Sequence, residues 1–156
     1  MNGLGKKAVL YSHNVRMMFF DLIRYAFILL FLYAATSKLL KYQDFEVQIA
    51  KSPILTDFAP FLVFLVPLTE TIIAILLFIP KTYGIGLYSS LSLMALFTSY
   101  IIVIMNLSDS IPCSCGGVLS TMSWTEHFFF NMIFLILAIL GILLQEKIKD
   151  IDIKHY

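Results

Sequence analysis

The two cysteines of the chain stand one residue apart, at Cys113 and Cys115, with Pro112 before them and Gly116 and Gly117 after them. Proline and glycine at these places predict a turn in place of a helix. In the chain-entropy model, a disulfide that closes so small a ring stabilises a fold by only about 1.6 kcal/mol. Such close neighbours also distort the preferred disulfide geometry, which makes the bond easier to reduce. The pair is therefore better suited to thiol–disulfide exchange than to holding a fold together.

Two other interpretations of the cysteine pair stay open. The pair is inert if it forms two unreactive thiols or a bridge that does not exchange. Alternatively, Cys113, Cys115, His127 and Met122 together offer the sulfur and imidazole ligands that Cu(I) prefers. Strong metal motifs show two ligand pairs at recognisable spacings, and this chain does not. Our main prediction therefore includes no metal.

His127 is the third candidate for this chemistry. Ser123, His127 and Asn131 follow one another at intervals of four residues and would share one face of a helix. That face points either into the bundle or under the cysteine loop. An imidazolium near a thiol lowers the pKa of the thiol, and a neutral imidazole can carry a proton. The alternatives are a solvated interfacial histidine, and an Asn131 that only bonds a neighbouring helix.

Glu70 lies near the middle of an apolar segment, where an ionisable side chain is costly and is by default a functional hypothesis. Counting helical rise, Lys38 and Arg24 both lie roughly 10 Å or more in depth from it, whereas Tyr33 and Ser92 lie nearer. The sequence therefore does not identify an ionic partner for Glu70. Lys38 is expected to extend its ammonium group to the lipid headgroups. Glu70 is interpreted either as a structural group or as part of a proton or quinone site.

The composition identifies an integral membrane protein. Of 156 residues, 60% are hydrophobic and 13% are charged, against about 45–50% and about 25% in soluble domains. The net charge of +1 and the scattered basic residues give no surface for nucleic acid. A chain of this length holds four spans and short connections, with little left for a soluble domain.

Four segments are apolar over the roughly 20 residues that a membrane helix needs. They are residues 22–40, 58–79, 85–105 and 128–144. The sequence thus predicts an all-α fold, a four-helix transmembrane bundle that forms a single domain over residues 1–156. Pro67 is expected to loosen the second span. Ser123 and Glu126 have the spacing of a capping box, which predicts that the fourth helix begins near Trp124.

The distribution of lysine and arginine predicts the orientation. With the N-terminus inside, eight basic residues fall in cytoplasmic segments and three in outer segments. The positive-inside rule then places both termini in the cytoplasm and the cysteine loop outside. In a bacterial inner membrane this loop would be periplasmic, in a compartment that permits disulfides. The first apolar segment lacks a clean A-x-A site, so we expect a retained helix and no cleaved signal peptide.

The order of these motifs resembles the MauE/DoxX-like membrane proteins, and most closely the MauE (methylamine utilisation) branch in its Bacteroidetes form. The likeness is carried by Ser37-Lys38-Leu39, Pro67-x-x-Glu70, Cys113-x-Cys115-Gly116, Trp124, His127, Phe130 and Asn131. Gly117 departs from the family pattern, which often has an aromatic residue there. The resemblance implies a four-helix membrane bundle and a role beside periplasmic thiol–disulfide proteins. It maps the family's C-x-C, glutamate and lysine onto Cys113 and Cys115, Glu70, and Lys38.

Three functional hypotheses follow. In the leading one, an inner-membrane protein exchanges disulfides with a periplasmic thiol–disulfide protein or a disulfide-containing client through Cys113 and Cys115. His127 would tune the thiol, while Lys38, Glu70 and Asn131 would act in the membrane interior, where a quinone is the one cofactor considered. In the second, a non-catalytic assembly or anchor subunit contacts its partner through residues 42–60 and 107–125. In the third, the chain carries copper.

Overall fold

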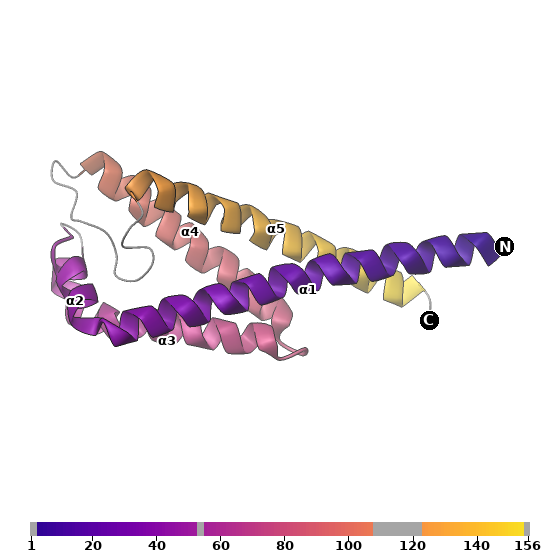
Figure 1. Ribbon diagram of the computed structural model, residues 1–156, viewed down its shortest axis with the longest axis horizontal. Helices are drawn as coiled ribbons and strands as arrows, with labels where there is room; N and C mark the ends of the chain where they lie inside the picture. Colours follow the sequence, from indigo (N-terminus) through magenta and orange to yellow (C-terminus); the bar gives the residue numbers. More distant parts are fainter. Residues whose placement is uncertain (1–2, 53–54, 108–122, 155–156) are drawn as a thin grey trace.

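The computed structural model describes residues 3–52, 55–107 and 123–154, and the regular elements within them are all helical (Figure 1). The elements are α1 (Gly3–Leu40), α2 (Tyr42–Ala50), the short 3₁₀-helix η1 (Thr56–Phe58), α3 (Ala59–Phe78), α4 (Tyr83–Leu107) and α5 (Trp124–Lys154). Helices α1, α3, α4 and α5 are long and apolar enough to cross a membrane. The predicted all-α fold with four transmembrane helices is therefore confirmed.

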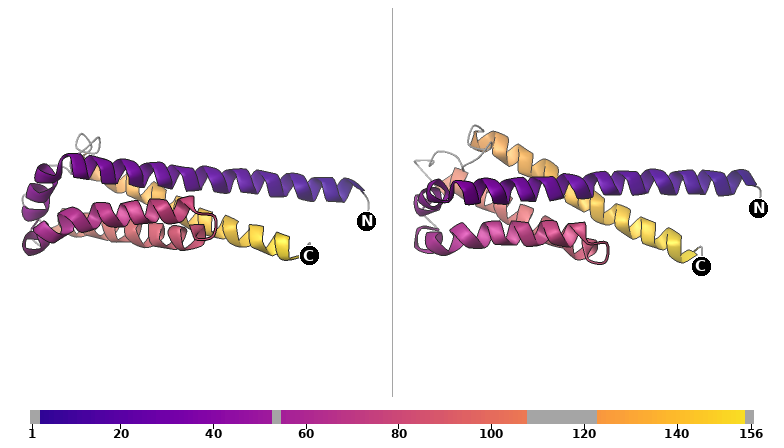
Figure 2. Two further views of the ribbon diagram at one scale, coloured as in Figure 1. Left: turned by 90° about the horizontal axis from the view of Figure 1, so that it is seen from below. Right: turned by 60° about the horizontal axis from the view of Figure 1, so that its bottom comes forward.

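The two middle spans agree with the sequence, and the two outer ones are longer than predicted. Helix α3 begins and ends within one residue of the predicted span, and α4 extends it by two residues at each end. Helix α1 begins at Gly3, well before the predicted start at Leu22, and α5 continues to Lys154. At 1.5 Å per residue, the 38 residues of α1 measure about 57 Å, against about 30 Å of hydrocarbon. Figure 2 shows α1 extending beyond the α3–α4 hairpin.

The bundle has two distinct ends. At the loop end, α1 ends at Leu40, α3 begins at Ala59, α4 ends at Leu107 and α5 begins at Trp124. At the opposite, termini end lie the first residues of α1 and the last residues of α5 (Figure 1). Four spans return the chain to the side from which it starts, so both ends of the described chain share one side.

The apolar core fills the half of the bundle nearer the termini end. Helices α1 and α4 each pack against both α3 and α5, so the four helices form a closed ring. Phe27, Leu77, Leu87 and Ala138 supply one fully buried side chain from each helix. The ring of Phe27 meets that of Phe134 edge to face, with centroids 5.3 Å apart. The core therefore joins the four helices to one another.

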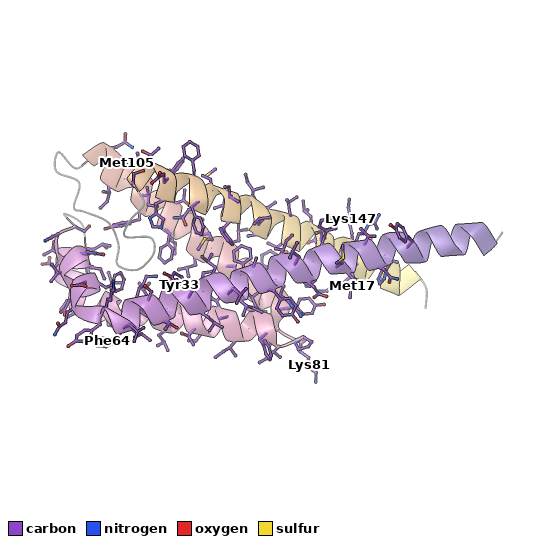
Figure 3. All side chains as sticks on the ribbon, viewed as in Figure 1. Met17, Tyr33, Phe64, Lys81, Met105 and Lys147 are labelled. Carbon is purple, nitrogen blue, oxygen red and sulfur yellow. The ribbon has the colours of Figure 1, made fainter. Side chains whose placement is uncertain are left out.

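The outer faces of the helices carry large apolar side chains. Phe64 on α3 is 60% exposed, and Leu29, Ile85 and Ile136 are exposed in the same way on the other three helices. Figure 3 shows Phe64 on the outer side of α3, pointing away from the bundle. In a water-soluble protein so many exposed apolar residues would drive aggregation. Here they face the lipid bilayer, as the four apolar spans require.

Helix α2 was not predicted, because its residues fall within the expected outer loop at residues 42–60. Phe45 and Ile49 are one helical turn apart and pack with Ala59 and Val63 of α3 in a second, smaller apolar cluster. Nine residues are too few to register as a membrane span. The i, i+4 spacing of two large apolar residues is the signal that identifies this helix. Figure 1 shows α2 lying at the loop end.

The predicted start of the fourth span is confirmed. The backbone N–H of Ser123 donates to the Glu126 carboxylate over 2.7 Å, and the N–H of Glu126 donates to Ser123 Oγ over 3.3 Å. This reciprocal pair satisfies two backbone donors that the first helical turn would otherwise leave open. Helix α5 accordingly begins at Trp124.

The α3–α4 hairpin depends on a close backbone approach at Gly86. A Cβ atom there would lie 2.9 Å from the backbone N of Leu77 on α3. At Gly84, two residues earlier on the same helix, the closest atom is the Nε2 end of the Gln145 side chain, at 2.7 Å. Backbone atoms cannot move aside cheaply, whereas a side-chain end can rotate. Small residues allow such contacts between membrane helices.

We expect Gly86→Ala to lower the free energy of unfolding by about 1–3 kcal/mol, because the new methyl group overpacks against α3. Alanine is intrinsically better than glycine in a helix by about 1 kcal/mol. Gly84→Ala, the matched control, should therefore leave stability unchanged or raise it. Denaturant unfolding of the purified protein in detergent measures both. Equal effects of the two substitutions would contradict the close approach.

Candidate functional site

A buried ion pair joins α1 to α3. Lys38 Nζ lies 2.7 Å from Glu70 Oε1, with the lysine side chain 14% exposed and the glutamate side chain 1% exposed. The hydrogen bond runs from the ammonium group to the carboxylate. Lys38 therefore points into the bundle, and the expectation that it reaches the headgroups is wrong. Taking one partner out of such a pair leaves an uncompensated charge inside the protein.

The expectation that Lys38 and Glu70 are too far apart in depth is also wrong. That estimate compares backbone positions, yet every Cα–Cβ bond in a helix tilts toward the helix N-terminus. Helices α1 and α3 run in opposite directions, so Lys38 leans toward the termini end while Glu70 leans toward the loop end. The two side chains converge between the helices. Arg24 instead pairs with Asp21 on its own helix, at 3.4 Å.

Aromatic rings flank the lysine. The ammonium nitrogen of Lys38 lies 5.8 Å from the ring centroid of Phe45 on α2 and 6.0 Å from that of Phe97 on α4. Both distances fall in the range in which the face of an aromatic ring attracts a cation. The charge is thus held by a carboxylate on α3 and by rings from two further helices. Four helices converge on one ammonium group.

The ion pair borders a cavity of about 510 Å³ in the loop-end half of the bundle. This volume lies within the usual range of small-molecule sites, which are mostly apolar with a few converging polar groups. The lining follows that pattern. Its polar members include Lys38, Gln48, Glu70, Tyr100, His127 and Asn131.

Helix α5 brings two of the predicted residues to this cavity. His127 and Asn131 both line it, as expected if their face points into the bundle, whereas Ser123 in the same row is exposed. Asn131 is 3% exposed, and its Nδ2 has no hydrogen-bond partner in the part of the chain that the structure describes. The same holds for Oε2 of Glu70. Buried polar atoms are nearly always bonded, so each exception needs an explanation.

The two residues expected to lie nearer in depth to Glu70 differ in their relation to the cavity. Tyr33 lines the same cavity from α1, in the loop-end half of that helix (Figure 3). Ser92 is exposed and donates to the backbone oxygen of Tyr88 over 3.0 Å, so it lies outside the site. Tyr33 thus belongs to the cavity wall and Ser92 does not.

The cysteine pair lies outside the described residues. Cys113, Cys115 and Met122 all fall there, so the exchange chemistry and the copper alternative stay predictions. Among residues 3–52, 55–107 and 123–154, no three His, Asp or Glu side chains gather as metal ligands would. The segment that carries the cysteines is joined to the bundle at the loop end, where α4 ends at Leu107 and α5 begins at Trp124.

Several lining residues were missed by the sequence analysis. Phe45 and Gln48 come from the unpredicted helix α2, and their signal is the spacing of Phe45 and Ile49. Phe97 and Tyr100 come from α4, a helix that is apolar on every side. Where lipid-facing and cavity-facing residues are of one type, periodicity does not distinguish the two faces.

Comparison with known proteins gives one finding. The family model for the methylamine utilisation protein MauE matches residues 16–144, from α1 into α5. The matched region includes Lys38, Glu70, His127 and Asn131, and it confirms the resemblance stated from the sequence motifs. Neither a curated protein nor a solved structure matches the chain.

We expect Lys38→Met and Glu70→Leu to destabilise the protein by about 3–5 kcal/mol each, because either leaves a buried charge without its partner. The double variant should lose much less than the sum, since it removes both charges. Unfolding free energies in mixed micelles, combined as a double-mutant cycle, give the coupling. Additive losses would contradict a direct pair.

The Asp21–Arg24 pair supplies a matched control. It also joins a carboxylate to a cation on α1, but at 3.4 Å and with one of the two side chains 43% exposed. Pairs of this kind contribute about 0–1 kcal/mol. The cycle of Asp21→Leu and Arg24→Met should therefore show little coupling.

Proposed function

The chain belongs to the MauE family, and we propose that it is an inner-membrane redox component that exchanges disulfides with a periplasmic partner through Cys113 and Cys115. The observation that carries this proposal is the position of the polar cavity. The cavity that holds Lys38 and Glu70 lies at the end of the bundle where the cysteine-containing segment is attached. The segment that carries the cysteine pair is thus attached at the end of the bundle that holds the polar site.

The exchange has two balanced steps. A thiolate from one cysteine attacks the partner's disulfide, forming a mixed disulfide and releasing the partner's second sulfur as a thiolate. The other cysteine then attacks the mixed disulfide, which closes the Cys113–Cys115 bond and releases the partner as a dithiol. Two electrons pass from this chain to the partner. Run in reverse, the same steps oxidise the partner.

His127 is our candidate for tuning this chemistry. It lies in the first turn of α5, at the loop end, half-buried against the cavity. An imidazole at this position can carry a proton to or from a thiol, and its cation favours the thiolate. The positive-inside rule supports a periplasmic location for this end of the bundle.

Replacing either Cys113 or Cys115 with serine should abolish exchange. One of the two single variants should also trap the partner, because a mixed disulfide persists when the cysteine that would resolve it is missing. Acid quench and mass-tag alkylation of intact cells, with and without a periplasmic reductant, report the redox state. Ser114→Ala is the matched control, since it alters the loop between the sulfurs and leaves both of them in place.

Other results would point to the alternative hypotheses. Full exchange by both cysteine variants would overturn the proposal. A partner that co-purifies stoichiometrically after loss of both cysteines would support a non-catalytic anchor subunit. Bound copper that disappears with Cys113 would support a metal carrier.

Substituting His127 with glutamine should slow exchange at neutral pH and shift its rate profile toward higher pH. The thiolate fraction falls about tenfold for each unit by which the thiol pKa rises. Exchange rates measured over a pH series with a small disulfide substrate give the profile. Thr125→Val, an exposed neighbour in the same turn, should leave the profile where it is. An unchanged profile for His127→Gln would remove His127 from the mechanism.

A further inference from the structure

We propose that the cavity binds the neutral ring of a lipid-soluble quinone, with a ring carbonyl accepting a hydrogen bond from Asn131. The site is built from described residues of α1, α2, α3, α4 and α5. Its redox role rests on the proposed function, whereas binding of the ring does not require the cysteines. Four observations carry the proposal.

The first observation is the pair of unsatisfied polar atoms at the cavity. Asn131 and Glu70 are 3% and 1% exposed, and Nδ2 of the one and Oε2 of the other lack partners among the described residues. A buried polar atom left without a hydrogen-bond partner lowers the stability of the protein. Lys38 adds donor capacity, since an ammonium group carries three N–H bonds and one is directed to Glu70. Nδ2 of Asn131 and the remaining N–H bonds of Lys38 call for an acceptor, which a quinone carbonyl provides. Oε2 of Glu70 calls for a donor, which a hydroxyl of the reduced hydroquinone provides.

The second observation is that the charge in the cavity is balanced. The cation of Lys38 lies 2.7 Å from the carboxylate of Glu70, so the pair has no net charge. A phosphate or carboxylate head group would bring an unpaired anion into a region where charge is costly. A head group that is polar and neutral fits this environment. The balance favours a quinone over a phospholipid or a fatty acid.

The third observation is the aromatic lining. Phe45, Phe97 and Phe130 come from three different helices and all border the cavity. Aromatic side chains pack against flat rings by offset stacking or edge contacts. The volume of about 510 Å³ accommodates a substituted ring together with the first part of a side chain.

The fourth observation is access from the lipid. Tyr33 and Leu96 line the cavity and are also 43% and 65% exposed, each well inside a membrane span. The cavity therefore reaches the lipid-facing surface of the bundle. A lipid-soluble ligand can insert its ring there and leave its isoprenoid chain among the acyl chains. A water-soluble ligand would gain nothing from such an entrance.

A quinone also balances the chemistry proposed for the cysteines. Oxidation of the Cys113–Cys115 dithiol to a disulfide releases two electrons and two protons. A quinone takes up two electrons and two protons and becomes the hydroquinone. Reduction of the disulfide by the hydroquinone reverses both halves. No further oxidant or reductant is needed in either direction.

Photolabelling of the full chain tests the inference. Purified protein in nanodiscs of quinone-free phosphatidylcholine is irradiated with a short-chain azidoquinone, and the labelled peptides are identified by mass spectrometry. We expect saturable labelling of the cavity-facing parts of α1 and α4, and competition by menaquinone-4. Labelling that does not saturate, or that phosphatidylethanolamine displaces equally well, would overturn the proposal.

Matched variants locate the binding. Asn131→Leu should weaken competition by menaquinone-4 about two- to tenfold through the lost hydrogen bond. Gln145→Leu replaces another buried amide of α5 that does not line the cavity, so it should have no such effect. Ala34→Phe should fill the cavity and abolish saturable labelling, whereas Thr36→Phe, at an exposed position on α1, should not. Equal effects within either pair would overturn the proposal.

The cysteine variants separate this inference from the proposed function. The double variant Cys113→Ser with Cys115→Ser should retain full quinone labelling, because the residues proposed to hold the ring all lie in the described helices. Loss of saturable labelling in that variant would contradict a ring site made of residues from the described helices. Intact exchange in a chain that shows no saturable labelling would refute the quinone site and leave the exchange function standing.

Discussion

A buried salt bridge between Lys38 and Glu70 constrains the loop-end half of the bundle. Burying its two charges carries a large desolvation cost, so the pair must stay together. Because the two atoms lie 2.7 Å apart, α1 and α3 cannot slide or rotate against each other without separating the charges. Helix α2 is tied to the same place, since Phe45 packs on α3 and faces the ammonium group. The pair thus fixes the register of α1 against α3 and the position of α2 beside them.

The two halves of the bundle are stabilised by different interactions, close apolar packing in one and polar contacts around a cavity in the other. Near the termini end the helices meet tightly, and a Cβ atom on Gly141 would lie 3.2 Å from Ile23 and 3.3 Å from Leu87. Near the loop end the space between the helices is a cavity bordered by polar groups. In α3, Pro67 lacks the N–H that would bond the preceding turn, and Thr71 donates its hydroxyl to the Pro67 carbonyl over 2.8 Å. Close packing at the termini end holds the four helices together, and the loop end can therefore contain a cavity.

Hydropathy predicted the four spans because each is a long apolar run, and the capping box predicted the start of α5 because its two hydrogen bonds are local. Helix α2 was missed because nine residues with two buried side chains are a weak signal. The partner of Glu70 was missed because the helical rise gives the depth of the backbone only and ignores the length and tilt of the Lys38 and Glu70 side chains. The cavity wall from α4 carries no signal, since that helix is apolar all round. The prediction for the cysteines rests on their spacing and on the family.

The buried pair argues for function more than for stability. Well-packed apolar residues in place of a buried ion pair are often neutral or stabilising, so stability alone does not favour keeping Lys38 and Glu70. Asn131 Nδ2 and Glu70 Oε2 support the same conclusion, because a buried polar atom without a hydrogen-bond partner lowers the stability of the protein. Natural sequences break local rules mainly at functional sites. Three polar residues from three helices that converge on one cavity, at an energetic cost, are best explained by something that the cavity binds.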